Sequence, residues 1–270
     1  MKTIRLIHNL PRSGGTIISK SLGAQKNVVL LSEIHPEGVS IRKKMGLPAF
    51  EFDPIWQSQI WYKLFEDDEY KRIFNSNLKF EEKIDIIYEK TESANKKLII
   101  RDWAFADFFG RPFIEPSYKN SLLEILNKKF QIINIYIIRH PLKFYSSCYN
   151  FLSFFRNDYN FDFILKGYRS FFHNASKDNI CVFENFILET EKSLRNICNL
   201  LKIDYDDNYQ NKLEFVNLTG DINAKNSVKI HNKDSVAKKK IINEDILNEL
   251  KNHPEFIKLM QDLKGYFKNE

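Results

Sequence analysis

The 270-residue sequence has few cysteines and no long hydrophobic run. Its three cysteines, Cys148, Cys181 and Cys198, stand in apolar segments without the paired spacing of metal ligands. That arrangement is typical of buried free thiols in a reducing compartment. No stretch approaches the roughly 18 apolar residues of a membrane span. No signal peptide precedes the first strand pattern. We therefore expect a cytoplasmic protein with no integral membrane segment and no metal site.

The composition is ordinary for a globular protein, with 43% hydrophobic and 28% charged residues. The net charge of +6 favours an anionic ligand, although a lysine- and asparagine-rich background accounts for it equally well. The length suits one large domain, which we expect to span residues 1–270. A helical and aromatic insertion at about residues 38–97 is expected to form the acceptor side of that domain.

Apolar runs and helical periodicities alternate along the chain, which predicts strands separated by helices. Such alternation implies a mainly parallel sheet, whose ligands bind at the carboxyl ends of the strands. We expect an α/β fold like that of P-loop NTPases, with three layers and a central sheet of about five strands flanked by helices. The expected strands are residues 4–8, 28–31, 98–100, 132–138 and 180–183, and the main helical patterns are residues 55–64, 80–88, 121–128, 142–155 and 190–201.

The loop after the first strand, Asn9 to Thr16, has the place of a nucleotide-binding P-loop but lacks its lysine. In the pattern G-x-x-x-x-G-K-[ST], aligned on Thr16, the lysine position is Gly15, and the cation has moved into the loop as Arg12. A strand that turns tightly into a helix presents backbone N–H groups to an anion. The sequence thus predicts an oxyanion ligand without the β/γ-phosphate chain that the lysine reaches.

A second candidate anion site follows the fourth expected strand. Arg139 stands at the end of the strand, Pro141 suits the first turn of a helix, and Ser147 lies about two turns into it. Arg139 and Ser147 could converge on one anionic group, the first through charged donors and the second through its hydroxyl. Taken alone, an arginine at such a helix start is more often part of a surface ion pair.

Together, these motifs resemble those of sulfotransferases that use 3′-phosphoadenosine 5′-phosphosulfate (PAPS). The family's P-[KR]-S-G-T-T loop is matched by residues 11–16, and its R-x-P motif with a later serine by residues 139–147. The family's Y-E-[DN]-[LF] segment is similar to Phe183–Phe186, and its G-D-x-x-x-x-x-S stretch is similar to Gly220–Ser227. The motifs occur in the family's order along most of the chain.

The resemblance implies how the donor would be held. The loop would bind the 5′-phosphosulfate, Arg139 and Ser147 would bind the 3′-phosphate, and the stretch from Gly220 with Lys225 would close over the nucleotide. Arg12 would also stabilise charge on the bridging oxygen as it leaves. The implied donor-binding residues are Pro11, Arg12, Ser13, Gly14, Gly15, Thr16, Arg139, Ser147, Gly220, Lys225, Asn226 and Ser227.

Two positions depart from the family's pattern. Gly15 replaces a threonine, so one hydroxyl contact is missing and the loop gains backbone freedom. Ile17 stands where many cytosolic members have a tryptophan near the adenine, so we expect adenine stacking to come from elsewhere or to be weaker.

Transfer to a hydroxyl needs a general base, and the candidates follow the second and third expected strands. Glu33 ranks first, because the resemblance includes members with a glutamate at this place. His35 ranks second and Asp102 third; Asp102 stands where cytosolic members have a histidine. In an extended segment Glu33 and His35 point to the same side. A purely structural role remains open for each: an arginine partner for either carboxylate, or a turn cap for His35.

The resemblance implies transfer of a sulfuryl group to a hydroxyl or amine. Two other classes remain open: a nucleotide or small-molecule kinase, which the missing lysine disfavours, and a non-catalytic protein that binds PAPS or its product PAP. The acceptor would be a small molecule, lipid or carbohydrate. Aromatic residues in 50–62 could wall its pocket or simply pack a helical layer. We expect no nucleic-acid partner, and a homodimer is left open.

Overall fold

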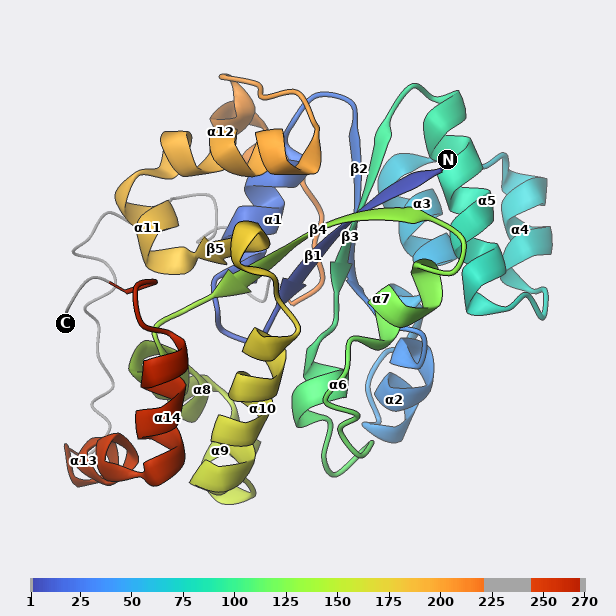
Figure 1. Cartoon of the computed structure of the whole chain (residues 1–270). Helices are drawn as coiled ribbons and strands as arrows, with labels where there is room; N and C mark the ends of the chain where they lie inside the picture. The colour runs from blue at the N-terminus through green and yellow to red at the C-terminus, as the bar shows by residue number, and fades with distance from the viewer. Residues whose placement is uncertain (1, 221–243, 268–270) are drawn as a thin grey trace.

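A five-stranded parallel sheet forms the centre of the protein. The computed structural model describes residues 2–220 and 244–267, and its strands run in the order β2-β3-β1-β4-β5 (Figure 1). Every neighbouring pair is parallel, which confirms the expected α/β architecture. The strands are β1 (Thr3–Asn9), β2 (Val28–Ile34), β3 (Lys97–Asp102), β4 (Gln131–Ile138) and β5 (Ile180–Val182).

Helices connect the strands and cover both faces of the sheet (Figure 1). The segment 38–97 supplies α2 to α5 between β2 and β3. The helices are α1 (Gly15–Gly23), α2 (Gly38–Lys44), α3 (Pro54–Tyr62), α4 (Asp67–Phe74), α5 (Phe80–Ser93), α6 (Phe105–Phe109), α7 (Ser121–Leu126), α8 (Pro141–Phe151), α9 (Ser153–Asn157), α10 (Phe161–His173), α11 (Phe183–Leu188), α12 (Thr190–Leu201), α13 (Glu244–Asn252) and α14 (Pro254–Asp262).

The alternation of side chains along each strand divides the core between the two faces. In β1, Ile7 packs with α1 and α12 on one face, whereas Ile4 and Leu6 pack with α3, α5 and α7 on the other. In β4, Tyr136 and Ile138 join a third cluster with α6, α8 and α10. Strands buried on both faces read as continuous apolar runs, which is why the sequence reveals them.

The structure extends or divides several expected elements. The helix α12 spans the expected residues, but the helical pattern at 142–155 is interrupted at Leu152, where α8 ends before α9 begins. β2 continues through Ile34, so Glu33 lies within the strand rather than after it. Cys148 and Cys198 are buried, whereas Cys181 is partly exposed.

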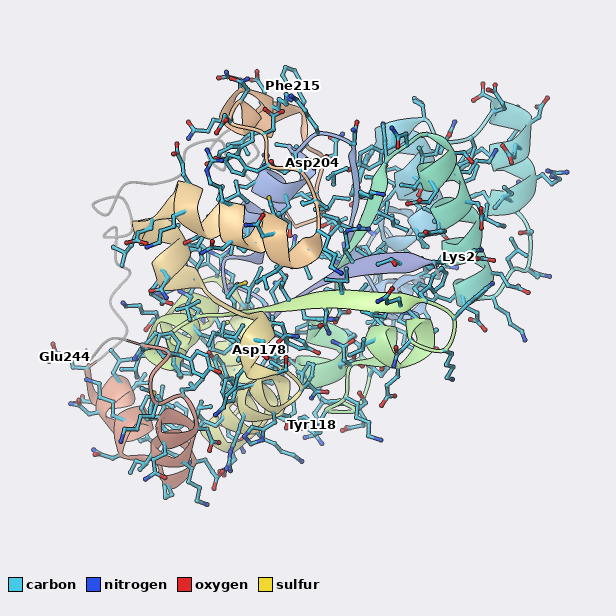
Figure 2. The ribbon with its side chains drawn as sticks, turned by 45° about the horizontal axis from the view of Figure 1, so that its top comes forward. Lys2, Tyr118, Asp178, Asp204, Phe215 and Glu244 are labelled. Carbon is cyan, nitrogen blue, oxygen red and sulfur yellow. The ribbon has the colours of Figure 1, made fainter. Side chains whose placement is uncertain are left out.

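The carboxyl ends of β1, β2, β3 and β4 place the candidate residues at one edge of the sheet. Lys2, just before β1, marks the opposite edge (Figure 2). None of the helices in the described residues is both long and apolar enough to cross a membrane. Within the same residues, no cluster of three or more histidine, cysteine or acidic side chains is arranged to hold a metal ion.

Candidate active site

The loop between β1 and α1 turns tightly. Arg12 and Gly14 adopt left-handed conformations, with φ of 62° and 89°, and the Ser13 N–H donates to the Leu10 carbonyl at 3.3 Å. A Cβ at Gly14 would lie 2.0 Å from the Phe183 ring, so the loop approaches α11 more closely than any side chain allows. The first turn of α1 carries no acidic residue, so the helix N-terminus favours an anion.

Ser13 has a hydroxyl without a protein partner. The residue is 1% exposed, and its Oγ has no hydrogen-bond partner among residues 2–220 and 244–267. A buried hydroxyl without a partner costs free energy, so an oxygen-rich ligand at this loop would relieve that cost.

The two candidate anion sites meet. Arg139 Nη1 donates to the Arg12 carbonyl at 2.8 Å, and Arg12 Nε donates to Ser147 Oγ at 3.2 Å. The Arg12 guanidinium also stacks on the ring of Phe151, 4.1 Å from its centroid. The end of β4 and the helix α8 thus place Arg139 and Ser147 beside the loop.

Arg139 is half-buried, and its surroundings shift the pKa of its side chain. Burial lowers the pKa of its guanidinium, and the charge of Arg12 adds to this, while Glu184 opposes it. Glu184 itself accepts a hydrogen bond from the His140 N–H at 3.1 Å. Arg139 Nε is buried without a hydrogen-bond partner in the described part of the chain. An anion placed against this guanidinium would meet an open donor.

Glu33 lies at an irregular point of β2. Its φ of 55° is left-handed, and the β2–β3 register shifts between Leu31 and Ile34. Its carboxylate reaches Arg101 Nη2 at 3.3 Å. The expectation of an extended segment is therefore wrong at Glu33. The Glu33 carboxylate contacts Arg101, whereas the His35 ring contacts Glu37 and Asp107.

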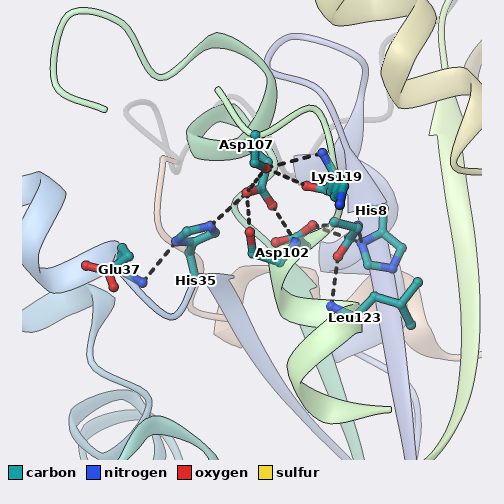
Figure 3. Close-up of polar contacts among 10 residues, drawn as sticks. His8, His35, Glu37, Asp102, Asp107, Lys119 and Leu123 are labelled. Atoms are coloured by element: carbon teal, nitrogen blue, oxygen red, sulfur yellow. Dashed lines mark hydrogen bonds and ion pairs between the residues drawn. The ribbon is translucent and has the colours of Figure 1, made fainter. Parts of the chain in front are cut away.

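His35 is buried, and both of its ring nitrogens are engaged (Figure 3). Nδ1 accepts from the Glu37 N–H at 3.0 Å, which leaves the ring to donate from Nε2 to Asp107 at 3.3 Å. Burial would raise the pKa of the Asp107 carboxyl, but hydrogen bonds from His35 and Ser121 hold it below its ordinary value. His35 therefore caps a turn and pairs with a carboxylate.

Asp102 is 1% exposed and lies beside His8 (Figure 3) in a buried cluster that also contains Asn120. Its Oδ2 lies 2.9 Å from His8 Nδ1 and accepts from Asn120 Nδ2 at 3.1 Å. The Asn120 Oδ1 accepts the Leu123 N–H, so the amide group faces the cluster with its nitrogen. Asp102 thus pairs with a histidine and an amide rather than with an arginine.

Sequence reasoning gives no role to several residues that build this site. These polar residues connect β1, β2, β3 and the segment before Gly220, and each is at least 93% buried: Asn9, Arg101, Gln57 and Thr219. A polar residue at the carboxyl end of an apolar strand is the sequence signal that could have found Asn9 and Arg101. Gly220 is described, whereas the predicted residues Lys225, Asn226 and Ser227 lie outside the described residues.

The aromatic residues of 50–62 form a partly exposed row. Phe50, which is 48% exposed, lies 5.2 Å from Trp56 between ring centroids, and Trp56 lies 6.3 Å from Trp61. In contrast, Phe52 is buried against Trp103. The row thus combines core packing with exposed aromatic surface.

The fold matches that of solved sulfotransferase domains. The sulfotransferase domain of the Synechococcus PCC 7002 olefin synthase has a TM-score of 0.60 and 16% identity, over 99% of this chain and 96% of that one. The sulfotransferase domain from the curacin biosynthetic pathway has a TM-score of 0.57 and 16% identity, over 100% and 99%. The sequence matches no protein-family model and no curated protein. The resemblance read from the motifs is thus confirmed for the fold.

Proposed function

We propose that the protein is a PAPS-dependent sulfotransferase that modifies a hydroxyl or amine of a small-molecule, lipid or carbohydrate acceptor. The observation that carries the proposal is the convergence of Arg12, Arg139 and Ser147 at the N-terminus of α1. The P-loop lysine is absent from that loop. The cations at the site are instead two guanidinium groups, that of Arg12 in the loop and that of Arg139 after β4. A ligand with two separate anionic groups matches this arrangement better than a triphosphate does.

The residues present fit such a donor. The unpartnered Ser13 Oγ and Arg139 Nε offer hydrogen-bonding capacity that the described protein residues do not use. Gly14 keeps the loop free of a side chain, and the α1 N-terminus presents backbone N–H groups. Ser13 and the loop would hold the 5′-phosphosulfate, and Arg139 with Ser147 the 3′-phosphate.

When bound, PAPS supplies the sulfuryl group and a phosphate leaving group. Arg12 stabilises the charge that grows on the bridging oxygen as the sulfur–oxygen bond breaks, which is the main contribution a positioned cation makes in such a transfer. A carboxylate takes the proton from the acceptor as the new bond to sulfur forms. The loop and α1 keep both groups aligned throughout.

Glu33 remains the first candidate base, and its carboxylate also has the arginine partner that the sequence left open, with Arg101 Nη2 at 3.3 Å. Its side chain is half-buried, and its Oε1 would lie 3.0 Å from a Cβ at Gly220, so the carboxylate borders the segment expected to cover the nucleotide. His35 has both nitrogens engaged, and Asp102 is enclosed with His8 and Asn120. We therefore keep Glu33 first among the candidates and assign His35 and Asp102 supporting roles.

Radiolabelled donor tests the proposal. The protein is incubated with [³⁵S]PAPS and a panel of phenols, aliphatic alcohols, sterols, sugars and amines, and labelled products are separated by chromatography. Labelled product with at least one acceptor is expected. Magnesium-dependent turnover of ATP without any transfer from PAPS would instead identify a kinase.

A further inference from the structure

The Ser32–Glu33 segment of β2 forms a bulge that places the candidate base. The β2–β3 register pairs Leu31 with Ile100 and next pairs Ile34 with Asp102. Between these two pairs, β2 therefore contains one residue more than β3. Glu33 takes a left-handed backbone conformation there. A residue other than glycine in this conformation persists where its surroundings enforce it, and such residues gather at functional sites.

Gln57 of α3 replaces the missing strand partner at the bulge. Its Oε1 accepts the Ser32 N–H at 2.7 Å, and its Nε2 donates to the Ser32 carbonyl, also at 2.7 Å. The Gln57 side chain is fully buried and also donates to the Glu51 carbonyl at 2.6 Å. One amide group thus reproduces both hydrogen bonds that a neighbouring strand would offer to Ser32.

Two further segments fix the same residue pair. Thr219 Oγ1 lies 3.0 Å from both the Ser32 carbonyl and the Ser32 hydroxyl. Arg101 of β3 donates to Ser32 Oγ and to the Glu33 carboxylate, both at 3.3 Å, and to Asn9 Oδ1 at 3.1 Å. The bulge is therefore tied to the loop after β1 through one arginine.

We infer that Gln57 is a positioning residue that sets the Glu33 carboxylate for proton abstraction. The inference rests on the proposed sulfotransferase function. The side-chain hydrogen bonds of Gln57 go to Ser32 and to the Glu51 carbonyl, so Gln57 acts on Glu33 through the Ser32 backbone, where two of these bonds hold the bulge. The helical segment 38–97 thereby contributes to catalysis from a buried position, in addition to any contact with the acceptor.

Gln59 supplies a matched control on the same helix. It is also buried, at 4% exposure, and its Oε1 accepts a backbone N–H, that of Phe65, at 3.1 Å. Within residues 2–220 and 244–267, no side-chain hydrogen bond of Gln59 reaches β2. Gln57→Met and Gln59→Met each replace a buried amide by a side chain of similar shape. Only Gln57→Met removes the two hydrogen bonds to the Ser32 backbone.

The first measurement is sulfuryl transfer from [³⁵S]PAPS to the acceptor that gives turnover in the panel. Gln57→Met should lower kcat roughly 10- to 100-fold, the cost of a misplaced catalytic group, and the dissociation constant of PAP should stay within about threefold. Gln59→Met should keep kcat near that of the wild type. In a Glu33→Gln background, Gln57→Met should add little further loss, because both changes remove the same function.

Amide hydrogen exchange provides a measurement that needs no acceptor. The Ser32 amide should exchange faster in Gln57→Met and at the wild-type rate in Gln59→Met. Wild-type kcat in Gln57→Met, or full additivity with Glu33→Gln, would overturn the inference. If Gln57→Met does not fold, Thr219→Val releases the Ser32 carbonyl from its second donor and should show the same pattern.

The failure of the two proposals is distinguishable. A wild-type protein that transfers nothing from PAPS and binds PAP no better than AMP contradicts the sulfotransferase function. That result also contradicts the positioning role, because no proton abstraction is left for Glu33 to perform. The exchange rate of the Ser32 amide still reports separately whether Gln57 holds the bulge. A working wild type with an unaffected Gln57→Met contradicts the positioning role alone.

Discussion

The side chain of Asn9 fills the space that a side chain at Gly15 would need. A Cβ built at Gly15 would lie 2.2 Å from Asn9 Cγ. Asn9 is held there by Arg101 Nε, which donates to its Oδ1, and by its own donation to the Leu10 carbonyl at 3.0 Å. In the P-loop pattern the first position is glycine and the other carries lysine. Here the large and the small residue have exchanged places, so a lysine at position 15 would clash with the Asn9 side chain.

This packing predicts that Gly15→Ala destabilises the loop. Because Asn9 must move to admit a methyl group, the free energy of unfolding should fall by about 1–3 kcal/mol, the usual cost of overpacking. Urea denaturation measures the change. In the Asn9→Ala background the same substitution should cost less, since the obstructing atoms are gone. Gly38→Ala is the control, because a Cβ there meets only ordinary contacts, the nearest at 3.6 Å. Equal effects at positions 15 and 38 would contradict this account.

Arg139 and Ser147 both contact Arg12, and their convergence there predicts a preference for a nucleotide with a 3′-phosphate. Calorimetry should show that PAP binds much more tightly than AMP. Arg139→Ala should weaken PAP binding by about 1.5–3 kcal/mol, the value of a charge-assisted hydrogen bond, and should hardly affect AMP. Arg169→Ala is the control, because Arg169 pairs with Asp262 and Glu255 on other elements. Equal affinity of the wild type for PAP and AMP would rule out this clamp.

The sequence predicts the parts of this site that depend on local order. The apolar strands are visible because both faces of the sheet are covered, and Arg12 and Arg139 are found because each lies in the turn after a strand. The helix α12 shows its apolar face in its periodicity. Such features need only neighbouring residues.

The bulge at Glu33 could not be predicted in the same way. The hydrogen bonds that hold it reach Ser32 from Gln57, 25 residues away, and from Thr219, 187 residues away. Nothing within Ser32–His35 itself marks a left-handed residue. The division between α8 and α9 is equally hidden, because the apolar pattern continues through Leu152.

The place of Arg12 predicts a loss in kcat rather than in donor binding. Its guanidinium matters most when the bridging oxygen gains charge, so Arg12→Ala should lower kcat about 100-fold or more. The dissociation constant of PAP should change far less. Arg12→Lys keeps the charge but loses the planar donor that now meets Ser147 and should have intermediate activity. A raised KM with an unchanged kcat would show that Arg12 only anchors the donor.

The Asp107–His35 contact predicts an acid-sensitive contribution to stability. Because the folded-state pKa of Asp107 lies below its ordinary value of 3.8, the carboxylate stabilises the fold above that value. The contribution is lost as the pH falls through 3.8 towards the lower folded-state pKa. Urea denaturation across this range should show a shallower pH dependence for Asp107→Asn than for the wild type. The exposed Asp204 (Figure 2), replaced by Asn, should leave the slope unchanged. Parallel curves for Asp107→Asn and the wild type would contradict this role.

The contacts of the three candidate bases predict different outcomes for their conservative variants. Glu33→Gln keeps the shape of the side chain and removes the proton acceptor, so transfer should fall by about 10²–10⁴, while PAP binding survives. Asp102→Asn and His35→Gln disturb buried hydrogen bonds instead. They should therefore lower the free energy of unfolding and leave kcat of the folded protein within about tenfold of the wild type. Transfer rates measured with [³⁵S]PAPS, set beside urea denaturation of each variant, separate the two effects. Near-normal turnover in Glu33→Gln together with abolished turnover in His35→Gln or Asp102→Asn would move the base to one of those residues. Normal transfer in all three would place it elsewhere, away from the ends of β2 and β3.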